Sequence, residues 1–308
     1  MAKNRMKHAR VTGVEREVSQ IIMGTLFAKD IDEAAPVFDY FLEQGGNCFD
    51  TARHYGDAEL VFGEWMQREG VRNQTVVITK GAHTPNCNPE SVTSQLVESL
   101  ERLQTDFIDI YFLHRDNLEI PVGEFVDVLN EHKSAGRLGV FGGSNWNLAR
   151  MDEANEYAAR NGLIGFTVLS NHLSLAQVVE IPYPGCIASS DAESRNWLAD
   201  RGIPLFPWSS QAQGFFADGR ADPADLSDPE LVRSWYSDDN FERLARVREL
   251  AARQGVATIS VALAWVLQQE NPTFPLIGPR SVEESKSSLA ALDIELSTPD
   301  MKWLNLED

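Results

Sequence analysis

Short runs of β-branched and apolar residues alternate along the chain with longer segments in which apolar residues recur every three or four positions. The short runs predict buried strands, and the longer segments predict amphipathic helices. The predicted strands are residues 20–24, 47–50, 75–80, 108–114, 139–144, 165–169, 204–208 and 273–277. The predicted helices between them are residues 32–44, 58–69, 89–103, 122–134, 148–161, 192–201, 241–254 and 282–292. Eight such units predict an α/β fold, a (β/α)8 TIM barrel that spans residues 1–308 as one domain.

Two segments fall outside this alternation. Residues 1–19 precede the first strand and contain Thr12 and Gly13, a pair typical of turns, so we expect a small hairpin that caps the barrel floor. Residues 209–240 follow the seventh strand and are rich in Asp, Pro, Ser and Gly. Connections of this length in a compact domain are usually functional, and we expect a lid over the active site. A further helix is predicted at residues 258–269.

Composition limits the class of protein. Hydrophobic residues make up 43% of the chain and charged residues 24%, as in ordinary soluble globular proteins. The formal net charge of −19 argues against nonspecific binding to nucleic acid or to anionic membrane surfaces. No run reaches the roughly 18 apolar residues that span a bilayer, and the basic N-terminus lacks the apolar stretch of a secretory signal. We therefore expect a cytoplasmic location.

Cysteine and histidine spacing predicts neither disulfides nor a metal site. The three cysteines are scattered without a CxxC pair, and the six histidines show no HxH or HExxH pattern. Reduced thiols are expected. The oligomeric state, the natural substrate and the physiological direction of any reaction stay open at this point.

Four polar residues stand at or near the ends of three successive predicted strands. Asp50 ends the second strand, Tyr55 follows five residues later, Lys80 ends the third strand, and His114 ends the fourth. Each residue alone has an ordinary reading, as a helix cap, a rim aromatic, a surface lysine or a core histidine. Because the C-terminal ends of parallel strands converge on one face of a barrel, their joint occurrence favours a proton-handling site.

These four residue types suit the reduction of a carbonyl group. Tyrosine has an ordinary pKa of about 10, and a nearby ammonium such as Lys80 should lower it and ease proton donation. Asp50 can pair with Lys80, and His114 can hydrogen-bond the substrate oxygen. The four residues supply no electrons, so a hydride donor is required, and nicotinamide is the usual one.

Four segments of the chain stand out: GNCFDTARHYGDAE, VVITK, SLERLQTDFIDIYFLH and GGSNW. They closely resemble the aldo-keto reductase superfamily, and the resemblance extends over residues 21–296. The resemblance implies a (β/α)8 barrel and an NADP(H)-dependent reductase that binds its cofactor across the strand ends without a Rossmann domain. The lack of a GxGxxG motif is therefore expected. The family's catalytic positions fall on Asp50, Tyr55, Lys80 and His114.

The resemblance also implies a set of cofactor contacts. By position these are Gly24, Thr25, Asp50, Ser144, Asn145, Ser170, Trp208, Ser209, Ser210, Gln211, Gly278, Arg280, Ser281, Glu284 and Ser288. Ser144 and Asn145 match the pair that binds the nicotinamide carboxamide, and Trp208 matches the aromatic residue that stacks on the ring. Residues 209–211 match the pyrophosphate contact, and residues 278–281 resemble the adenosine-phosphate site.

Three departures from the family pattern concern the cofactor. Ser170 stands where a glutamine usually holds the carboxamide, so one hydrogen bond is expected to be missing or relayed by water. Glu284 replaces Arg or Gln, and its charge would repel a 2′-phosphate. Ser288 lies where relatives have part of an adenine-binding pair. Arg280, with Lys286 nearby, favours the phosphate, so NADP(H) is preferred and NAD(H) is the alternative.

The substrate is expected to be a small carbonyl compound held by loops at the strand ends. The predicted pocket walls are Leu26, Phe27, His54, Arg115, Asp116, Trp146, Phe215 and Phe216. The aromatic residues favour stacking on a ring, while Arg115 and Asp116 could bind hydroxyls or charge. An aromatic aldehyde, a keto-sugar or a similar ketone fits this description.

Two other functions remain as alternatives. Lys80 could form a Schiff base in an aldolase-type barrel, although a neighbouring Asp50 carboxylate opposes the neutral amine that this requires. The chain could also be a redox-sensing subunit that holds NADP(H) and turns over slowly. The observation that separates them is hydride-dependent turnover.

Overall fold

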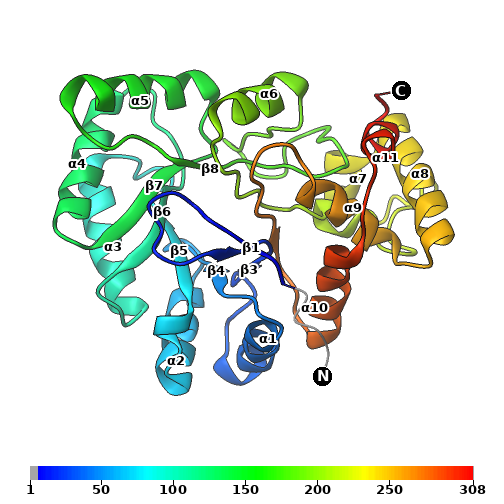
Figure 1. Ribbon diagram of the computed structural model, residues 1–308, viewed down its shortest axis with the longest axis horizontal. Coiled ribbons are helices and arrows are strands. Elements are labelled where there is room, and N and C mark those ends of the chain that lie inside the picture. Colours follow the sequence, from blue (N-terminus) through cyan, green and yellow to red (C-terminus); the bar gives the residue numbers. More distant parts are fainter. Residues whose placement is uncertain (1–5, 308) are drawn as a thin grey trace.

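A computed structural model describes residues 6–307 and shows a barrel of parallel strands surrounded by helices (Figure 1). The sheet order is β8-β7-β6-β5-β4-β3-β9, and every neighbouring pair is parallel. The strands are β3 Ile22–Gly24, β4 Cys48–Asp50, β5 Val76–Gly81, β6 Ile108–Leu113, β7 Leu138–Ser144, β8 Val168–Ser170 and β9 Leu276–Ile277.

The gap between β8 and β9 is closed by the segment predicted as the seventh strand. Leu205 forms parallel bridges to Leu169 on one side and to Thr273 on the other. Pro204 and Pro207 flank this segment and have no N–H to donate, so it pairs through single residues rather than as a continuous strand. The predicted (β/α)8 fold is confirmed, with a short seventh strand.

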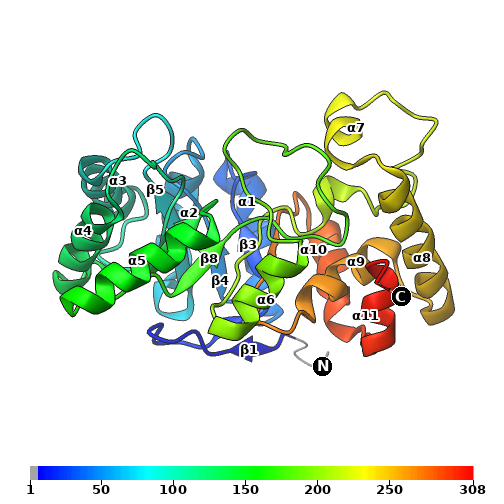
Figure 2. The same ribbon diagram turned by 90° about the horizontal axis from the view of Figure 1, so that it is seen from above.

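Inward-facing side chains fill the barrel, and a hairpin covers its lower end. The barrel cluster includes Ile22, Ile78 and Phe112. The antiparallel strands β1 His8–Ala9 and β2 Val18–Ser19 form the hairpin, whose Val11 and Val18 belong to the same cluster. Figure 2 shows β1 at the opposite end of the molecule from α7, which spans Pro229–Trp235. This arrangement leaves the C-terminal ends of the strands as the accessible face.

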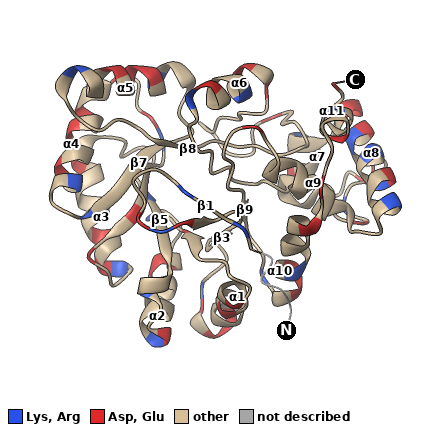
Figure 3. Cartoon of the chain, in the orientation of Figure 1, with Lys and Arg blue, Asp and Glu red and all other residues tan. Residues whose placement is uncertain are grey.

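Helices pack around the strands, each beginning and ending close to the predicted bounds. They are α1 Ile31–Glu43, α2 Ala58–Glu69, α3 Pro89–Arg102, α4 Val122–Ser134, α5 Leu148–Asn161, α6 Ala192–Arg201, α8 Asp238–Gln254, α9 Thr258–Leu267 and α10 Val282–Leu289. Short 3-10 turns occur at Arg72–Gln74, Ala212–Gly214 and Ala290–Asp293. Charged residues are most frequent on these outer helices (Figure 3).

Two short helices were not expected from the sequence. α7 Pro229–Trp235 lies inside the segment 209–240, and α11 Thr298–Leu304 lies near the C-terminus. Each begins with a capping side chain followed by proline in the first turn, and Asp228 and Ser297 are the caps. These local signals predict helix starts, but the helices are only two turns long.

Within residues 6–307 no single helix is both long and apolar enough to cross a bilayer. Only the pair α8 and α9, bent by 102°, reaches that length and composition together.

Candidate active site at the strand ends

A buried ion pair joins the ends of β4 and β5. Lys80 Nζ lies 2.6 and 2.5 Å from the two carboxylate oxygens of Asp50 and donates to the carbonyl of Thr51 at 3.0 Å. Both charged side chains are almost fully buried. The parallel register places Asp50 beside Ile78, so Lys80 extends two residues further along the next strand and reaches back to the carboxylate. The ammonium is thereby fixed in position.

Tyr55 lies in the turn that leads from β4 to α2 and sits over this ammonium. Lys80 Nζ is 5.2 Å from the centre of the Tyr55 ring, and the two side chains also interact through the phenol hydroxyl. Burial alone lowers the pKa of Lys80, but Asp50 and Tyr55 more than offset this, so the pKa of Lys80 is raised and the ammonium stays charged. The structure thus brings phenol and ammonium together.

The direction of the Tyr55 pKa shift differs from the sequence expectation. Burial raises the pKa of the phenol, the positive charge of Lys80 lowers it, and the net pKa lies above the ordinary value of 10.0. The expected net lowering of the Tyr55 pKa is wrong, because removing the phenolate from water destabilises it more than the Lys80 ammonium stabilises it. The phenol therefore keeps its proton through neutral pH, which suits a proton donor.

His114 completes the group and belongs to a cluster of three imidazoles. Its ring centre is 5.7 Å from the Tyr55 ring and 4.8 Å from that of His83, edge to face in both cases. His83 in turn stacks flat on His54, with centres 3.9 Å apart and planes within 2°. Burial, with help from the charges of Lys80 and Arg115, holds the pKa of His114 well below 6.5, so its ring is neutral. The predicted site did not include His83.

The residues expected to hold the nicotinamide also lie together. Trp208 Nε1 donates to the Asn145 side-chain oxygen at 3.1 Å, and Asn145 Nδ2 donates to Ser144 Oγ at 3.1 Å. Asn145 has a left-handed backbone with φ of 60°, a conformation that asparagine tolerates better than most residues. These contacts connect the end of β7 with the segment after Leu205. Trp208 is half-buried, so part of its ring remains accessible.

Ser170 forms its hydrogen bonds within the barrel wall. Its side chain is fully buried, and its hydroxyl donates to the carbonyl of Phe206 at 2.8 Å. The Ser170 carbonyl accepts from Ser144 Oγ at 3.0 Å. A short serine at this position thus satisfies its hydroxyl inside the barrel wall. The cofactor contact at Ser170 stays a prediction, with its hydrogen bond missing or relayed by water.

Gly24 and Thr25 follow β3 at the next edge of the site. A Cβ on Gly24 would come within 2.9 Å of the carbonyl oxygen of Ile277, so a side chain here would push β3 away from β9. Thr25 N donates to the Asp50 carbonyl at 2.8 Å, while its hydroxyl is buried without a hydrogen-bond partner. Buried hydroxyls are normally paired, so this one is suited to a polar group of a ligand.

The predicted pyrophosphate segment and the adenine contact lie next to each other. Ser210 Oγ donates to the Pro207 carbonyl at 2.7 Å, and Ser209 has a φ of 50°. Ser288 Oγ donates to the Gln211 side-chain oxygen at 3.3 Å. This contact joins the loop after the seventh strand to α10.

The end of the site near α10 is open to solvent. Gly278, Arg280 and Glu284 are exposed, whereas Ser281 is half-buried. Ser281 Oγ caps α10 by accepting from Glu284 N at 3.2 Å, and Glu284 Oε2 accepts from Arg280 N at 2.7 Å. Glu284 therefore has a local capping role. It still carries its negative charge beside Arg280.

Several predicted pocket walls belong to the protein interior instead. Trp146 is fully buried and packs against Phe125 and Phe166, and Phe215 and Phe216 are also fully buried. These rings are not available to a substrate. His54 and Leu26, by contrast, are exposed at the rim.

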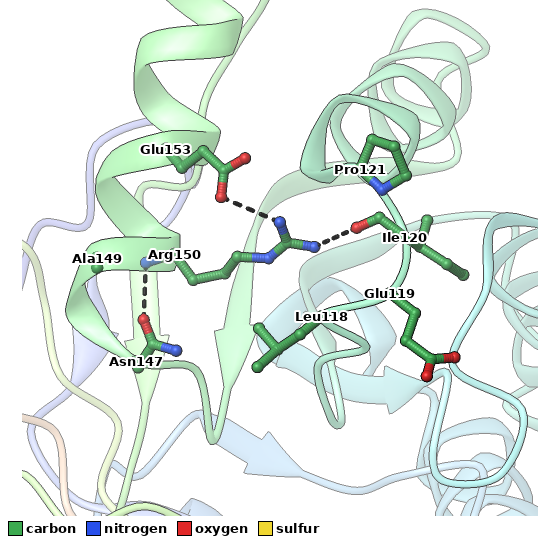
Figure 4. A pocket seen from close by; sticks show the side chains of 8 residues that line it. All are labelled: Leu118, Glu119, Ile120, Pro121, Asn147, Ala149, Arg150 and Glu153. Carbon is green, nitrogen blue, oxygen red and sulfur yellow. Dashed lines mark hydrogen bonds and ion pairs between the residues drawn. The ribbon is translucent and has the colours of Figure 1, made fainter.

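Asp116 is also occupied. Arg150 Nε lies 3.1 Å from its carboxylate, and the rest of that guanidinium bonds to the Ile120 carbonyl and Glu153. The bonds of Arg150 to Ile120 and Glu153 lie in a surface pocket between the loop after β6 and the start of α5 (Figure 4). Asp116 thus forms part of a network of bonds around Arg150 that holds the loop after β6 against α5, so its carboxylate is already paired. Among residues 6–307, no group of three His, Cys, Asp or Glu side chains is placed to hold a metal ion.

Known proteins with related sequences point to one family. A family model described as Aldo/keto reductase family matches residues 20–305. A norsolorinic acid reductase of Emericella nidulans is 30% identical over 90% of this chain and 72% of that protein. An aryl-alcohol dehydrogenase [NADP(+)] of Phanerodontia chrysosporium is 27% identical over 92% of this chain and 77% of that protein.

The fold is shared with a solved structure. An aldo-keto reductase from Klebsiella pneumoniae, crystallised in complex with NADPH, superposes with a TM-score of 0.75. The alignment covers 98% of this chain and 94% of that one, at 22% sequence identity.

Proposed function

Because the chain belongs to the aldo/keto reductase family, we propose that it reduces an aldehyde or ketone to an alcohol, with NADPH as hydride donor and Tyr55 as general acid. As a member of that family the protein is an oxidoreductase. The proposal for Tyr55 rests on one observation, the phenol held over a buried, charged Lys80 that is itself fixed by Asp50.

The chain's own residues account for the proton side of the reaction. NADPH, when bound, supplies the hydride, which carries two electrons to the carbonyl carbon. Tyr55 gives its proton to the carbonyl oxygen, so the products are the alcohol, NADP⁺ and a phenolate that regains a proton from water. Lys80 stabilises that phenolate, and neutral His114 can donate a hydrogen bond to the same oxygen. Each group thus acts where negative charge develops.

The residues along the barrel mouth fit a nicotinamide cofactor. The unpaired Thr25 hydroxyl, the Ser144–Asn145 pair and the accessible ring of Trp208 offer hydrogen bonds and a stacking surface. The exposed guanidinium of Arg280 favours the 2′-phosphate of NADPH over NADH. One relative is named for NADP(+), and the solved neighbour is a complex with NADPH. NAD(H) remains the alternative cofactor, since Glu284 lies beside Arg280.

An aromatic carbonyl compound is the substrate that we favour. The stacked pair of His54 and His83 presents flat ring surfaces next to His114. Relatives are named for aryl alcohols and for norsolorinic acid. Keto-sugars remain the alternative, because the strand ends also carry the Arg115 guanidinium, which could bind hydroxyls.

The test is NADPH consumption with a panel of aromatic aldehydes, ketones and oxidised sugars. Tyr55→Phe is expected to lower kcat by about 100- to 10,000-fold, because general acid catalysis contributes that much, while NADPH affinity changes only slightly. Tyr157→Phe on α5 is the matched control, because its hydroxyl bonds only to Asp127 at 2.9 Å, away from the strand ends. Reduction by Tyr55→Phe at the unmodified rate would exclude Tyr55 as the acid.

The same preparation separates the other functions. The charged, doubly paired state of Lys80 argues against a Schiff-base lysine, and borohydride trapping of a substrate adduct on Lys80 would overturn that argument. A slow redox-sensing subunit would bind NADPH yet oxidise it in a single turnover at the same rate with and without a carbonyl compound.

A further inference from the structure

We propose that the buried guanidinium of Arg115 binds an anionic group of the substrate, so that the preferred substrate is an aromatic carbonyl compound that carries a carboxylate. This inference rests on the proposed function and assigns a role to a residue outside the catalytic group.

Arg115 is held in place at the strand ends. It directly follows His114 after β6 and is 8% exposed. Its Nη1 donates to the His114 carbonyl at 2.8 Å. Its Cδ and Nε lie 3.8 Å from the position that a Cβ on Gly185 would take, so the loop after β8 covers it closely. The side chain is therefore pre-positioned, with little freedom left to lose when a ligand binds.

The guanidinium lacks a counter-charge. Its Nε is buried without a hydrogen-bond partner, and within residues 6–307 no carboxylate forms an ion pair with it. Asp116, the adjacent acid, is taken by Arg150 at 3.1 Å. A buried charge without a partner is costly, and proteins normally pair it. The missing partner is the observation that points to a ligand.

The groups around Arg115 are neutral. The guanidinium contacts the thiol of Cys186, and burial raises the pKa of Cys186 and of Cys87. Burial also lowers the pKa of His83, so this ring carries no charge at neutral pH. None of these groups balances the positive charge. An incoming carboxylate would do so through a charge-assisted hydrogen bond.

The position of Arg115 connects this anion with the reacting carbonyl. Arg115 bonds to the carbonyl of His114, whose ring centre lies 5.7 Å from the Tyr55 ring, so it lies near the proton donor. Its positive charge contributes to lowering the pKa of both Tyr55 and His114. The other cation of the site, Lys80, is already neutralised by Asp50. An anionic group held by Arg115 would therefore lie on the same substrate molecule as the carbonyl held by Tyr55.

The decisive experiment compares carboxybenzaldehydes with the matching formylbenzamides, which have the same shape without the charge. The 2-, 3- and 4-isomers are all used, with NADPH at saturation and pH 7.5. For at least one isomer, kcat/KM of the unmodified protein should be about tenfold or more higher for the acid than for the amide, as a charge-assisted contact implies. An acid-to-amide ratio near one for all isomers overturns the inference, even if both compounds are reduced.

Two variants locate the effect. Arg115→Gln should lower the acid-to-amide ratio about tenfold or more, and Arg115→Lys should keep part of the preference because it keeps the charge. The matched control is Arg201→Gln on α6, whose guanidinium pairs with Asp152 at 2.9 Å on the outside of the barrel. An unaltered ratio in Arg115→Gln would contradict the assignment to this residue.

A binding measurement keeps this inference separate from the proposed function. Calorimetric titration of benzoate and benzamide into the protein with NADP⁺ requires no turnover. Tighter binding of benzoate, lost in Arg115→Gln, supports the anion site even if no aldehyde is reduced. Active reduction of neutral aldehydes with equal binding of benzoate and benzamide would instead retain the reductase and reject the anion site.

Discussion

The two ends of the proposed cofactor track are built in opposite ways. At the ends of β4, β5 and β6 the polar groups are buried, and Lys80 and Asp50 satisfy each other at 2.5 Å. At the end of β9 and the start of α10, Arg280 and Glu284 are exposed and attach to the chain mainly through a capping contact at 2.7 Å. One end is a preorganised site in a low-dielectric environment, and the other is a hydrated charged surface.

Because of this difference, the two ends should respond differently to the substitution of a charged residue. Charges in a buried, water-poor site interact strongly, and removing one leaves its partner unpaired. Charges on a hydrated surface are screened, so their loss affects ligand affinity by a modest factor and stability hardly at all. Substitutions at the catalytic end should therefore change chemistry and folding together, whereas substitutions near α10 should change only the choice of cofactor.

The largest effect is expected from Lys80→Met. The variant leaves the Asp50 carboxylate buried without its cation, which should cost about 3–5 kcal/mol of unfolding free energy, besides lowering carbonyl reduction. Burial already raises the pKa of Asp50 in the unmodified protein, although Lys80 opposes the shift, and loss of that cation should raise the pKa further above its unfolded value. The variant should therefore be relatively more stable at pH 5 than at pH 8, where folding must keep the carboxylate charged. Urea unfolding at both pH values measures this.

The same substitution near α10 provides the contrast. Lys286 is exposed and pairs with Glu283 at 3.4 Å, so Lys286→Met should change stability much less than Lys80→Met. The double variant Asp50→Asn with Lys80→Met should recover much of the loss, because no isolated charge remains. Equal losses for Lys80→Met and Lys286→Met would show that burial of the ion pair does not matter.

Local sequence patterns predicted most helices and strands well, because the start, end and buried face of each element depend on residues close together in the sequence. The end of β4 at Asp50 and the helix bounds of α4, α5 and α6 follow from periodicity, proline and glycine, while β6 ends at Leu113, one residue before the predicted end. α7 was missed because it is short and lies within a polar segment of unusual length. Leu205 was expected within a full strand, but Pro204 and Pro207 reduce its pairing to single bridges.

The candidate site was predicted in its members but not in its energetics. The positions of Tyr55 and Lys80 follow from strand ends, which sequence reveals. The net pKa shift of Tyr55 depends on how deeply the phenol is buried, which no local pattern encodes. Asp116 pairs with Arg150, which is 34 residues away in the sequence. Because a local pattern does not reveal such a distant partner, the sequence could not show that Asp116 is unavailable to a substrate. Arg115 was predicted in the pocket wall together with Asp116, and the pairing of Asp116 leaves Arg115 as the charged member without a counter-charge.

An effect of intermediate size is expected on the pH dependence of stability, and it concerns His172, which lies between the two ends of the proposed cofactor track. His172 packs against Trp208 with ring centres 5.0 Å apart, and burial lowers the pKa of His172 to about 3, with a partial offset from the Ser209 backbone. The unfolded chain binds a proton at this residue below about pH 6.5 and the folded chain does not, so stability falls as pH decreases from 6.5 towards 3.

The change amounts to about 1.4 kcal/mol per pH unit for one histidine. His172→Gln should remove that contribution, so the difference in stability between variant and unmodified protein should shrink as pH falls from 7 to 5. Urea unfolding across this interval measures the slope. A constant difference would mean that His172 titrates in the folded protein much as it does in the unfolded chain.

The smallest effect is expected at the exposed end. Arg280→Ala should weaken NADPH binding by about tenfold and NADH binding by much less, because only NADPH carries the 2′-phosphate. Glu284→Gln keeps an oxygen that can accept from the Arg280 amide and removes one negative charge, so it should tighten NADPH a few-fold. Fluorescence titrations at two salt concentrations provide the dissociation constants. Since a hydrated charge is screened, the Arg280 effect should diminish at high salt, whereas equal losses for both cofactors would place the 2′-phosphate elsewhere.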